Sequence, residues 1–221
     1  MGKKKLIHFQ ENLGFPFLFQ PTYPALDEGF HLKSRWCSDF FGNSNPLVTE
    51  LGCGKGEYTV GLAGLHPEKN YIGIDLKGAR LWRGCKWVEE KGLRNAAFLR
   101  TRVDHILKVF GEGELSEIWI TFPDPQPGKE RLRLTSPIFI DRYRKVLRKD
   151  GIIHLKTDDE HFFRYTLQVI AGDGHHLLWH TFDLYGSETT EEAALFRTYY
   201  EMKWLEAGKK IHYLRFQPAC I

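Results

Sequence analysis

Acidic side chains stand at or near the ends of four apolar segments of the sequence: Glu50, Asp75, Asp124 and Asp158. A carboxylate in such a place can accept hydrogen bonds from a ligand. Asp75 follows the glycine-rich run 52–56 after one helical and one strand-like stretch, at the separation where an acid meets the ribose diol of a nucleoside. Asp124 lies between two prolines, which restrict the backbone around it. These residue types favour a nucleoside site with a second acid beside it.

The glycine-rich run Gly52-Cys53-Gly54-Lys55-Gly56 narrows the choice of ligand. Its glycines let the backbone turn tightly and approach a ligand closely, because no Cβ stands in the way. The pattern G-x-G-x-G differs from the G-x-G-x-x-G that seats a pyrophosphate, and no Lys-Ser or Lys-Thr pair follows as in a P-loop. A nucleoside without phosphates fits better, and S-adenosylmethionine is the common one. The alternative is a tight turn with no ligand, which any α/β protein can contain.

The hydrophobic pattern predicts the elements that would position these residues, as alternating strands and helices. Strands are expected at 47–51, 70–75, 96–100, 117–122, 151–156, 177–184 and 210–216. Helices are expected at 31–41, 57–65, 77–91, 104–110, from 137 onward, after Asp158, and over 191–206 with Leu195, Tyr199, Met202 and Leu205 buried. Such alternation predicts a doubly wound α/β sheet, whose ligands collect at the carboxyl ends of the strands.

Basic residues cluster in three places, and two of these clusters have an alternative explanation to ligand binding. The clusters are Lys129, Arg131 and Arg133 in the loop after Asp124; Arg142, Arg144, Lys145, Arg148 and Lys149 near a helix end; and the row Lys77, Arg80, Arg83 and Lys86. The loop is where a polyanion would reach the site. The second cluster also suits the C-terminal end of a helix dipole. The third is either a phosphate-binding face or a solvated helix surface.

Length and composition allow one domain and exclude some classes of protein. The chain has 221 residues with 42% hydrophobic content, enough to bury one full core. A formal net charge of +3 and a pI near 8.6 permit a polyanionic partner without arguing for one. The four cysteines form no C-x-x-C pair and no zinc spacing, which indicates a reduced, cytoplasmic chain with no metal. Because no apolar run is long enough to span a bilayer, we expect no membrane contact.

Six short motifs occur in order along the chain. They are E-L-G-C-G-K-G at 50–56, Y-I-G-I-D at 71–75, F-P-D-P at 122–125, R-L-T at 133–135, H-L-K-T-D at 154–158 and T-Y-Y-E at 198–201. From residue 47 to the C-terminus, this ordered set closely resembles the bacterial tRNA (guanine-N7-)-methyltransferase family. The resemblance implies a Rossmann-like class I methyltransferase: a seven-stranded, mostly parallel sheet with the last strand antiparallel and helices on both faces. We expect a single domain over 1–221, with an aromatic-rich N-terminal extension at 1–46 and a catalytic core at 47–221.

The resemblance also implies a reaction, its partners and the residues that serve it. The reaction is methyl transfer from S-adenosylmethionine to N7 of a guanosine in the variable loop of tRNA, by a cytoplasmic monomer or homodimer. The cofactor-binding positions are Glu50, Gly52, Gly54, Asp75 and Asp124, of which Asp124 is also the active-site acid. The substrate-binding positions are Lys129, Arg133, Asp158, Thr198 and Glu201. The sequence alone also allows Asp158 to cap the helix that follows it, and both roles can hold at once.

Three features depart from the family pattern. Gln126 stands where tryptophan usually follows Asp-Pro, the basic loop is shorter than the common form, and Arg102 replaces an acid that faces the adenine. The shorter loop affects the match at Lys129 in particular. Because a fold does not dictate a substrate, two rival functions stay open. One is a small-molecule methyltransferase of the same fold, and the other is an RNA-binding module without catalysis.

Overall fold

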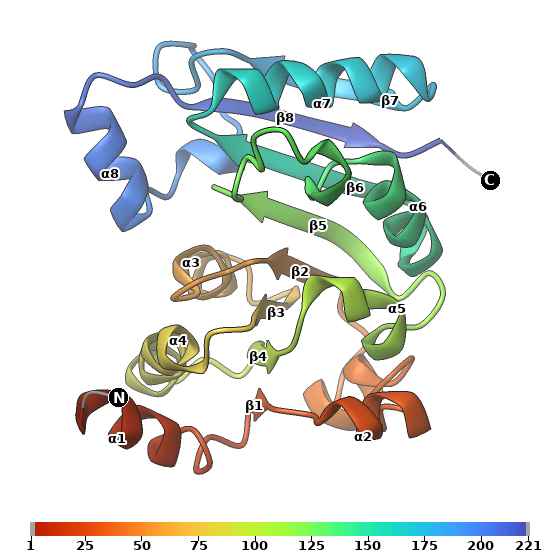
Figure 1. Ribbon diagram of the computed structural model, residues 1–221. Helices are drawn as coiled ribbons and strands as arrows, with labels where there is room; N and C mark the ends of the chain where they lie inside the picture. The colour runs from red at the N-terminus through yellow and green to blue at the C-terminus, as the bar shows by residue number, and fades with distance from the viewer. Residues whose placement is uncertain (1–2, 220–221) are drawn as a thin grey trace.

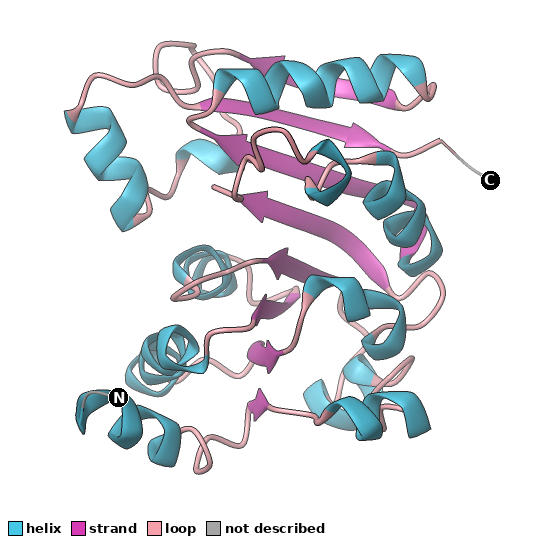
Figure 2. Ribbon diagram, viewed as in Figure 1, coloured by secondary structure: helices cyan, strands magenta, loops and turns pink. Residues whose placement is uncertain are grey.

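The computed structural model describes residues 3–219 and is built around one sheet (Figures 1 and 2). The strands lie in the order β1-β4-β3-β2-β5-β6-β8-β7. Their bounds are β1 Leu18–Phe19, β2 Leu47–Leu51, β3 Asn70–Asp75, β4 Ala96–Arg100, β5 Leu115–Thr121, β6 Leu147–Thr157, β7 His176–Thr181 and β8 His212–Gln217. All neighbouring pairs are parallel except the two made by β8, which runs against β6 and β7. The predicted mostly parallel sheet with an antiparallel last strand is confirmed.

Within residues 3–219 the sheet has eight strands, so the predicted count of seven was wrong by one. The additional strand, β1, is only two residues long and pairs with β4 through Leu18↔Phe98 and Phe19↔Leu99. A segment this short shows no alternation that a sequence pattern could reveal. Within the predicted helix 31–41, only Trp36–Phe41 is helical, as a short π-helix. Trp36 is fully buried in the main core, so the N-terminal extension completes that core.

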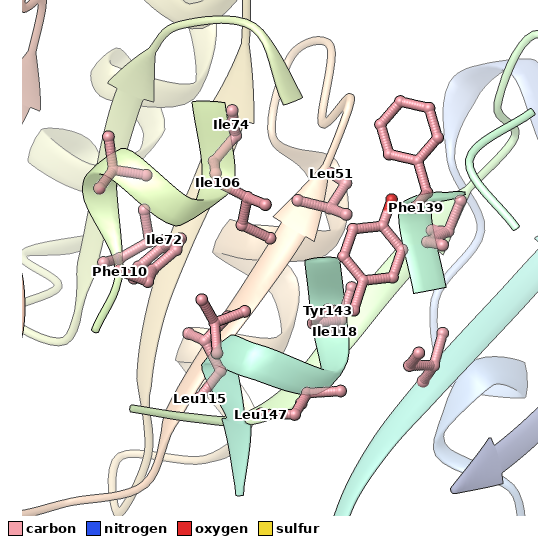
Figure 3. Packing of buried hydrophobic residues seen from close by; sticks show 14 of the residues in the cluster. Leu51, Ile72, Ile74, Ile106, Phe110, Leu115, Ile118, Phe139, Tyr143 and Leu147 are labelled. Carbon is pink, nitrogen blue, oxygen red and sulfur yellow. The ribbon is translucent and has the colours of Figure 1, made fainter. Parts of the chain in front are cut away.

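Helices cover both faces of the sheet, as predicted (Figure 2). Their bounds are α1 Lys3–Glu11, α2 Tyr23–Glu28, α3 Glu57–Leu65, α4 Gly78–Lys91, α5 Ile106–Val109, α6 Pro137–Val146, α7 Glu160–Gly172 and α8 Tyr199–Glu206. On one face, Leu51 and Ile118 of the sheet pack with Tyr143 of α6 (Figure 3). On the other face, Phe98 packs with Leu81 of α4. The two packed faces hold the strand ends rigidly in place.

The helix predicted over 191–206 is shorter, and its buried face was assigned wrongly. The α-helix begins only at Tyr199, after a single 3-10 turn at Glu192–Ala194. Leu195, Tyr199 and Met202 are exposed, and only Leu205 of the predicted set packs against the core, partly buried. Glu201 is completely buried. The spacing of the apolar residues suggested that their face of the helix is buried. Instead, the face that carries Glu201 turns inward, because Glu201 has a buried partner, Lys156.

The strand order reverses at the edge where the parallel strands end. From β2 the chain builds outward through β3 and β4, and then returns to the other side of β2 to form β5 and β6. The direction of building thus reverses between β3 and β5, with β2 as the shared neighbour. Ligands of open α/β sheets bind at this reversal, outside the carboxyl ends of the strands.

Several further features of the described chain bear on its chemistry. Across residues 3–219, no helix is long and apolar enough to cross a membrane. Cys37, Cys53 and Cys85 are free thiols, and Cys220 lies outside the described residues. No group of three or more His, Cys, Asp or Glu side chains in the same part of the chain is arranged to hold a metal ion.

Candidate functional site

The predicted acids lie along a single edge of the sheet. Glu50 is near the end of β2, Asp75 ends β3, Asp124 follows β5 and Asp158 follows β6. These four strands are mutually parallel and adjacent in the order β3-β2-β5-β6. Their carboxyl ends therefore meet at the same edge, on both sides of the reversal point. We call this edge the rim.

Asp75 is joined directly to the glycine-rich turn. One carboxylate oxygen accepts the Gly54 N–H at 3.0 Å, and the other accepts the Lys77 N–H at 2.6 Å. Gly52 and Gly54 have φ of +71° and +59°, and a Cβ built on either would meet no atom within 4 Å. The glycines are therefore required by backbone conformation, and the space beside them is open. This leaves a half-buried carboxylate with spare acceptor capacity beside an uncovered backbone turn.

Glu50 lies below the rim and has its acceptors occupied by the protein. One carboxylate oxygen accepts the Thr59 N–H at 2.9 Å and the Thr59 hydroxyl at 2.6 Å, and the other accepts the Thr121 hydroxyl at 2.7 Å. Burial raises the pKa of Glu50 to about 7, and these hydrogen bonds only partly offset the effect. Glu50 thus ties β2 to the start of α3 and the end of β5, and its predicted contact with the cofactor stays a prediction.

Asp124 is exposed on a loop whose backbone is strained. Its carboxylate accepts the Gln126 N–H at 3.0 Å and so closes a tight turn. Phe122 and Gln126 adopt φ of +47° and +48°, a region that costs a residue with a side chain roughly 1–2 kcal/mol. Strain of this kind persists where the surrounding structure enforces it, and it is commonly found at functional sites. The turn presents the rest of the Asp124 carboxylate to solvent at the rim.

The basic loop after Asp124 contains two predicted substrate-binding residues, one buried and one exposed. Arg133 is 2% exposed, and its Nε donates to the Pro125 carbonyl at 3.0 Å. Its guanidinium also lies over the Tyr165 ring, 4.3 Å from the ring centroid. Lys129 is exposed, and its ammonium makes no hydrogen bond or ion pair within the described part of the chain. Arg133 therefore fixes the loop that carries Asp124, whereas Lys129 is available to a partner.

Asp158 lies on the rim, where its carboxylate is paired with Lys209 at 2.6 Å. The sequence left open whether Asp158 also caps the following helix. The structure gives that role to Asp159, which accepts the Phe162 N–H at 2.7 Å. The capping alternative for Asp158 was therefore wrong.

Thr198 and Glu201 form the start of α8. The Thr198 hydroxyl accepts the Glu201 N–H and the Glu201 carboxylate accepts the Thr198 N–H, which makes a reciprocal capping box. Glu201 also pairs with Lys156 of β6 at 2.5 Å, and both side chains are completely buried. The Tyr185 hydroxyl donates to the same carboxylate at 2.6 Å. These contacts give both residues an internal structural role, so their predicted contact with a substrate stays a prediction.

Lys156 is the residue of this region that sequence reasoning missed as important. Its ammonium contacts the Tyr58 hydroxyl and the Ala193 carbonyl, each at 2.6 Å, as well as Glu201. Burial lowers the pKa of Lys156 to about 8, although Glu201 acts in the opposite direction. A lysine within the otherwise apolar strand 151–156 was the available signal, because a buried lysine requires a partner.

The open turn and the acid beside it fit a nucleoside cofactor. The carboxylate of Asp75 can still accept from a ribose diol, and the space outside Gly52 and Gly54 is free for the rest of the ligand. The last strand, β8, lies between β6 and β7 and pairs antiparallel with both. Together the fold and the rim define a Rossmann-like class I methyltransferase.

Comparisons with known proteins support this class and narrow it. Two solved structures share the fold, each with a TM-score of 0.63. "Structure of an Antibiotic Related Methyltransferase" is 18% identical in sequence and covers 87% of this chain and 96% of its own chain. "Crystal Structure of 16S rRNA Methyltranferase KamB" is 14% identical and covers 82% of this chain and 92% of its own chain. Residues 44–214 match the family model described as "Putative methyltransferase". A tRNA (guanine-N(7)-)-methyltransferase from Christiangramia forsetii is 51% identical over 98% of both chains, and one from Bacteroides thetaiotaomicron is 46% identical over 98% of this chain and 86% of the relative. The chain belongs to the tRNA (guanine-N7-)-methyltransferase family.

Proposed function

We propose that this protein transfers a methyl group from S-adenosylmethionine to N7 of a guanosine in the variable loop of tRNA. The observation that carries the proposal is the near full-length match to relatives of that name. The rim supports it, because its parallel strands bring a nucleoside-type turn and an exposed acid to the same edge. The proposal also takes residues 1–221 as one domain, with 1–46 as its extension, acting in the cytoplasm as a monomer or homodimer.

The residues divide into a cofactor side and a substrate side. Gly52, Gly54 and Asp75 line the cofactor position, and Glu50 holds the turn from below. Asp124 stands between the two sides as the active-site acid. The substrate side comprises Lys129, Arg133, Asp158, Thr198 and Glu201, of which Lys129 is the most accessible. The cofactor supplies an electrophilic methyl group on a positively charged sulfur.

The reaction asks the protein mainly for position and electrostatics. Guanine N7 has a free lone pair and no proton, so no general base is needed before attack. Holding two reacting atoms in line at contact distance can contribute roughly 7–11 kcal/mol. The purine gains positive charge as N7 is methylated. The Asp124 carboxylate, directed to solvent by its turn with Gln126, can accept a hydrogen bond from the guanine edge and favour that charge.

The test is methylation of unmodified bulk tRNA followed by nucleoside analysis and mapping of the modified position. The expected product is 7-methylguanosine in the variable loop. Absence of methyl transfer would leave an RNA-binding module. A small-molecule methyltransferase would instead work at a rate that is insensitive to salt, whereas binding to tRNA weakens steeply as salt rises. A methylated guanosine elsewhere in the tRNA would contradict only the position.

A further inference from the structure

A cavity of about 920 Å³ lies at the opposite edge of the sheet from the rim. It opens where β5 and β6 begin, beside the end of α6 and the loop before β5. β5 spans about 20 Å from this edge to the rim, so the cavity is separate from the candidate functional site. Its cationic lining residues are Lys33, Arg144, Lys145, Arg148 and Lys149, and its acidic lining residue is Glu112.

Most of this positive charge is not neutralised by the protein. Arg144 pairs with Asp141, and the Lys33 ammonium donates to the Leu107 carbonyl. Lys145, Arg148 and Lys149 are exposed and make no ion pair among residues 3–219. Three unpaired cations within five positions repel one another. An anionic partner would relieve that repulsion.

The helix dipole accounts for only part of the cluster. Lys145 lies in the last turn of α6, where a cation is favourable. Arg148 and Lys149 lie beyond the helix, in β6, and Lys33 comes from a distant segment of the chain. Because the dipole effect fades within the last turn, it does not explain why these residues converge.

The cluster is connected to the rim side through α6. A second cavity, of about 800 Å³, lies at the other end of this helix and is lined by Lys129, Arg131 and Arg142 together with Asp104 and Glu130. α6 has ten residues and is therefore about 15 Å long. In Figure 1 the helix leads from the loop after β5 toward the edge where β5 and β6 begin. Cations thus occur at both ends of one short helix.

We propose that the cluster formed by Lys33, Arg144, Lys145, Arg148 and Lys149 is a second contact surface for the phosphodiester backbone of the tRNA substrate. The inference rests on the proposed function and extends the contact from the basic loop along α6 to the far edge of the sheet. An RNA backbone suits the surface better than a small anion does, because the unpaired cations of the surface are exposed and spread along the far edge of the sheet. The contact is electrostatic and independent of sequence.

The test compares two triple charge reversals that change the net charge equally. The test variant is K145E/R148E/K149E. The control is K91E/R94E/R164E, whose positions are exposed at the end of α4, just beyond it, and on α7. tRNA affinity is measured by fluorescence anisotropy over a range of salt concentrations. We expect the test variant to bind tRNA at least tenfold more weakly than the control. The slope of log affinity against log salt should become shallower by about 2–3, since three phosphate contacts are lost.

Equal affinity and equal slope in the two variants would overturn the inference. A second outcome would overturn the inference in favour of a small-anion site. In that outcome, millimolar inorganic phosphate protects the wild-type protein against heat but does not protect the test variant, and the two proteins bind tRNA equally well. Circular dichroism and thermal unfolding check that each variant folds, and K145Q/R148Q/K149Q replaces the reversal if it does not. Because binding is measured without turnover, failure of the wild-type protein to form 7-methylguanosine would contradict the proposed function alone.

Discussion

Two pairs of acids lie near the same edge of the sheet and differ in what their oxygens contact. Asp75 and Asp124 are on the rim. Asp75 accepts the N–H groups of Gly54 and Lys77, Asp124 accepts that of Gln126, and both keep acceptor capacity for a ligand. Glu50 and Glu201 are buried, and their oxygens are engaged by hydroxyl, amide or ammonium groups of the protein. The comparison supports the proposal that the rim acids serve the ligand, whereas the buried acids hold the elements that shape the rim.

The two buried acids achieve this differently. Glu201 faces a lysine, so the charge is paired, and the pair joins α8 to β6. Glu50 has no cation beside it in the described structure and relies on two threonines and one backbone N–H. In the ion pair, removal of either charged side chain leaves the other buried without a partner, so each depends on the other. At Glu50, which has no such partner, the free energy of unfolding depends on pH.

The largest expected effect is on the free energy of unfolding, when Glu201→Ala removes the carboxylate that pairs with Lys156. Removing one partner of a buried ion pair costs roughly 3–5 kcal/mol, because the other charge stays buried and uncompensated. Urea unfolding should show this loss. The double variant K156M/E201L removes both charges and should recover most of the stability. Equal losses in the single and double variants would contradict the pairing.

The next effect tests the rim and concerns activity. Asp124→Ala removes the carboxylate, and turnover on tRNA should fall roughly 10²-fold or more, as when one preorganised electrostatic contact is lost. Asp124→Asn is the matched control, because its amide oxygen can still accept the Gln126 N–H. It should keep the turn but lose the charge. Turnover of D124N equal to wild type, with D124A impaired, would show that the turn matters and the charge does not.

The third effect is the pH dependence caused by Glu50. Burial raises the pKa of this carboxyl from its ordinary 4.5 to about 7 in the folded protein. Between these values the folded state holds a proton that the unfolded state has released. Stability therefore falls as pH rises through this window and stays lower above it. Relative to Glu50→Gln, the wild-type free energy of unfolding should decline by roughly 3 kcal/mol from pH 4.5 to 7. A constant difference would exclude this cause.

Patterns read from the chain predicted the elements around the glycine-rich turn and Asp75 better than those around Thr198 and Glu201, for a physical reason. The turn at 52–56 and Asp75 belong to one continuous strand–helix–strand unit, so periodicity and glycine spacing determine their placement. α8 is oriented by Lys156, which is far away in the sequence, and the apolar spacing of Leu195, Tyr199 and Met202 suggested the wrong face. Long-range pairing of buried charges leaves little trace in a local pattern.

A smaller effect is expected at Asp75, whose two oxygens each accept a backbone N–H. Asp75→Asn keeps one acceptor and directs an amide N–H₂ at the other donor. S-adenosylmethionine should therefore bind about tenfold more weakly, equivalent to about 1.4 kcal/mol. Calorimetric titration measures this directly. Unchanged affinity would mean that Asp75 acts only on the turn and would remove it from the cofactor side.

The smallest effect concerns the strain beside the rim acid. The residues other than glycine that have positive φ in the described chain are Ser34, Phe122 and Gln126, and two of these flank Asp124. Gln126→Gly relieves a left-handed conformation that costs roughly 1–2 kcal/mol but adds backbone freedom to the unfolded state. We expect a net gain of about 0.5–1 kcal/mol in the free energy of unfolding. Gln126→Ala, which keeps a Cβ, is the matched control and should give no gain. If both variants were equally stable, the left-handed turn would store no strain, and only the hydrogen bond to Asp124 would distinguish this loop from the buried acids.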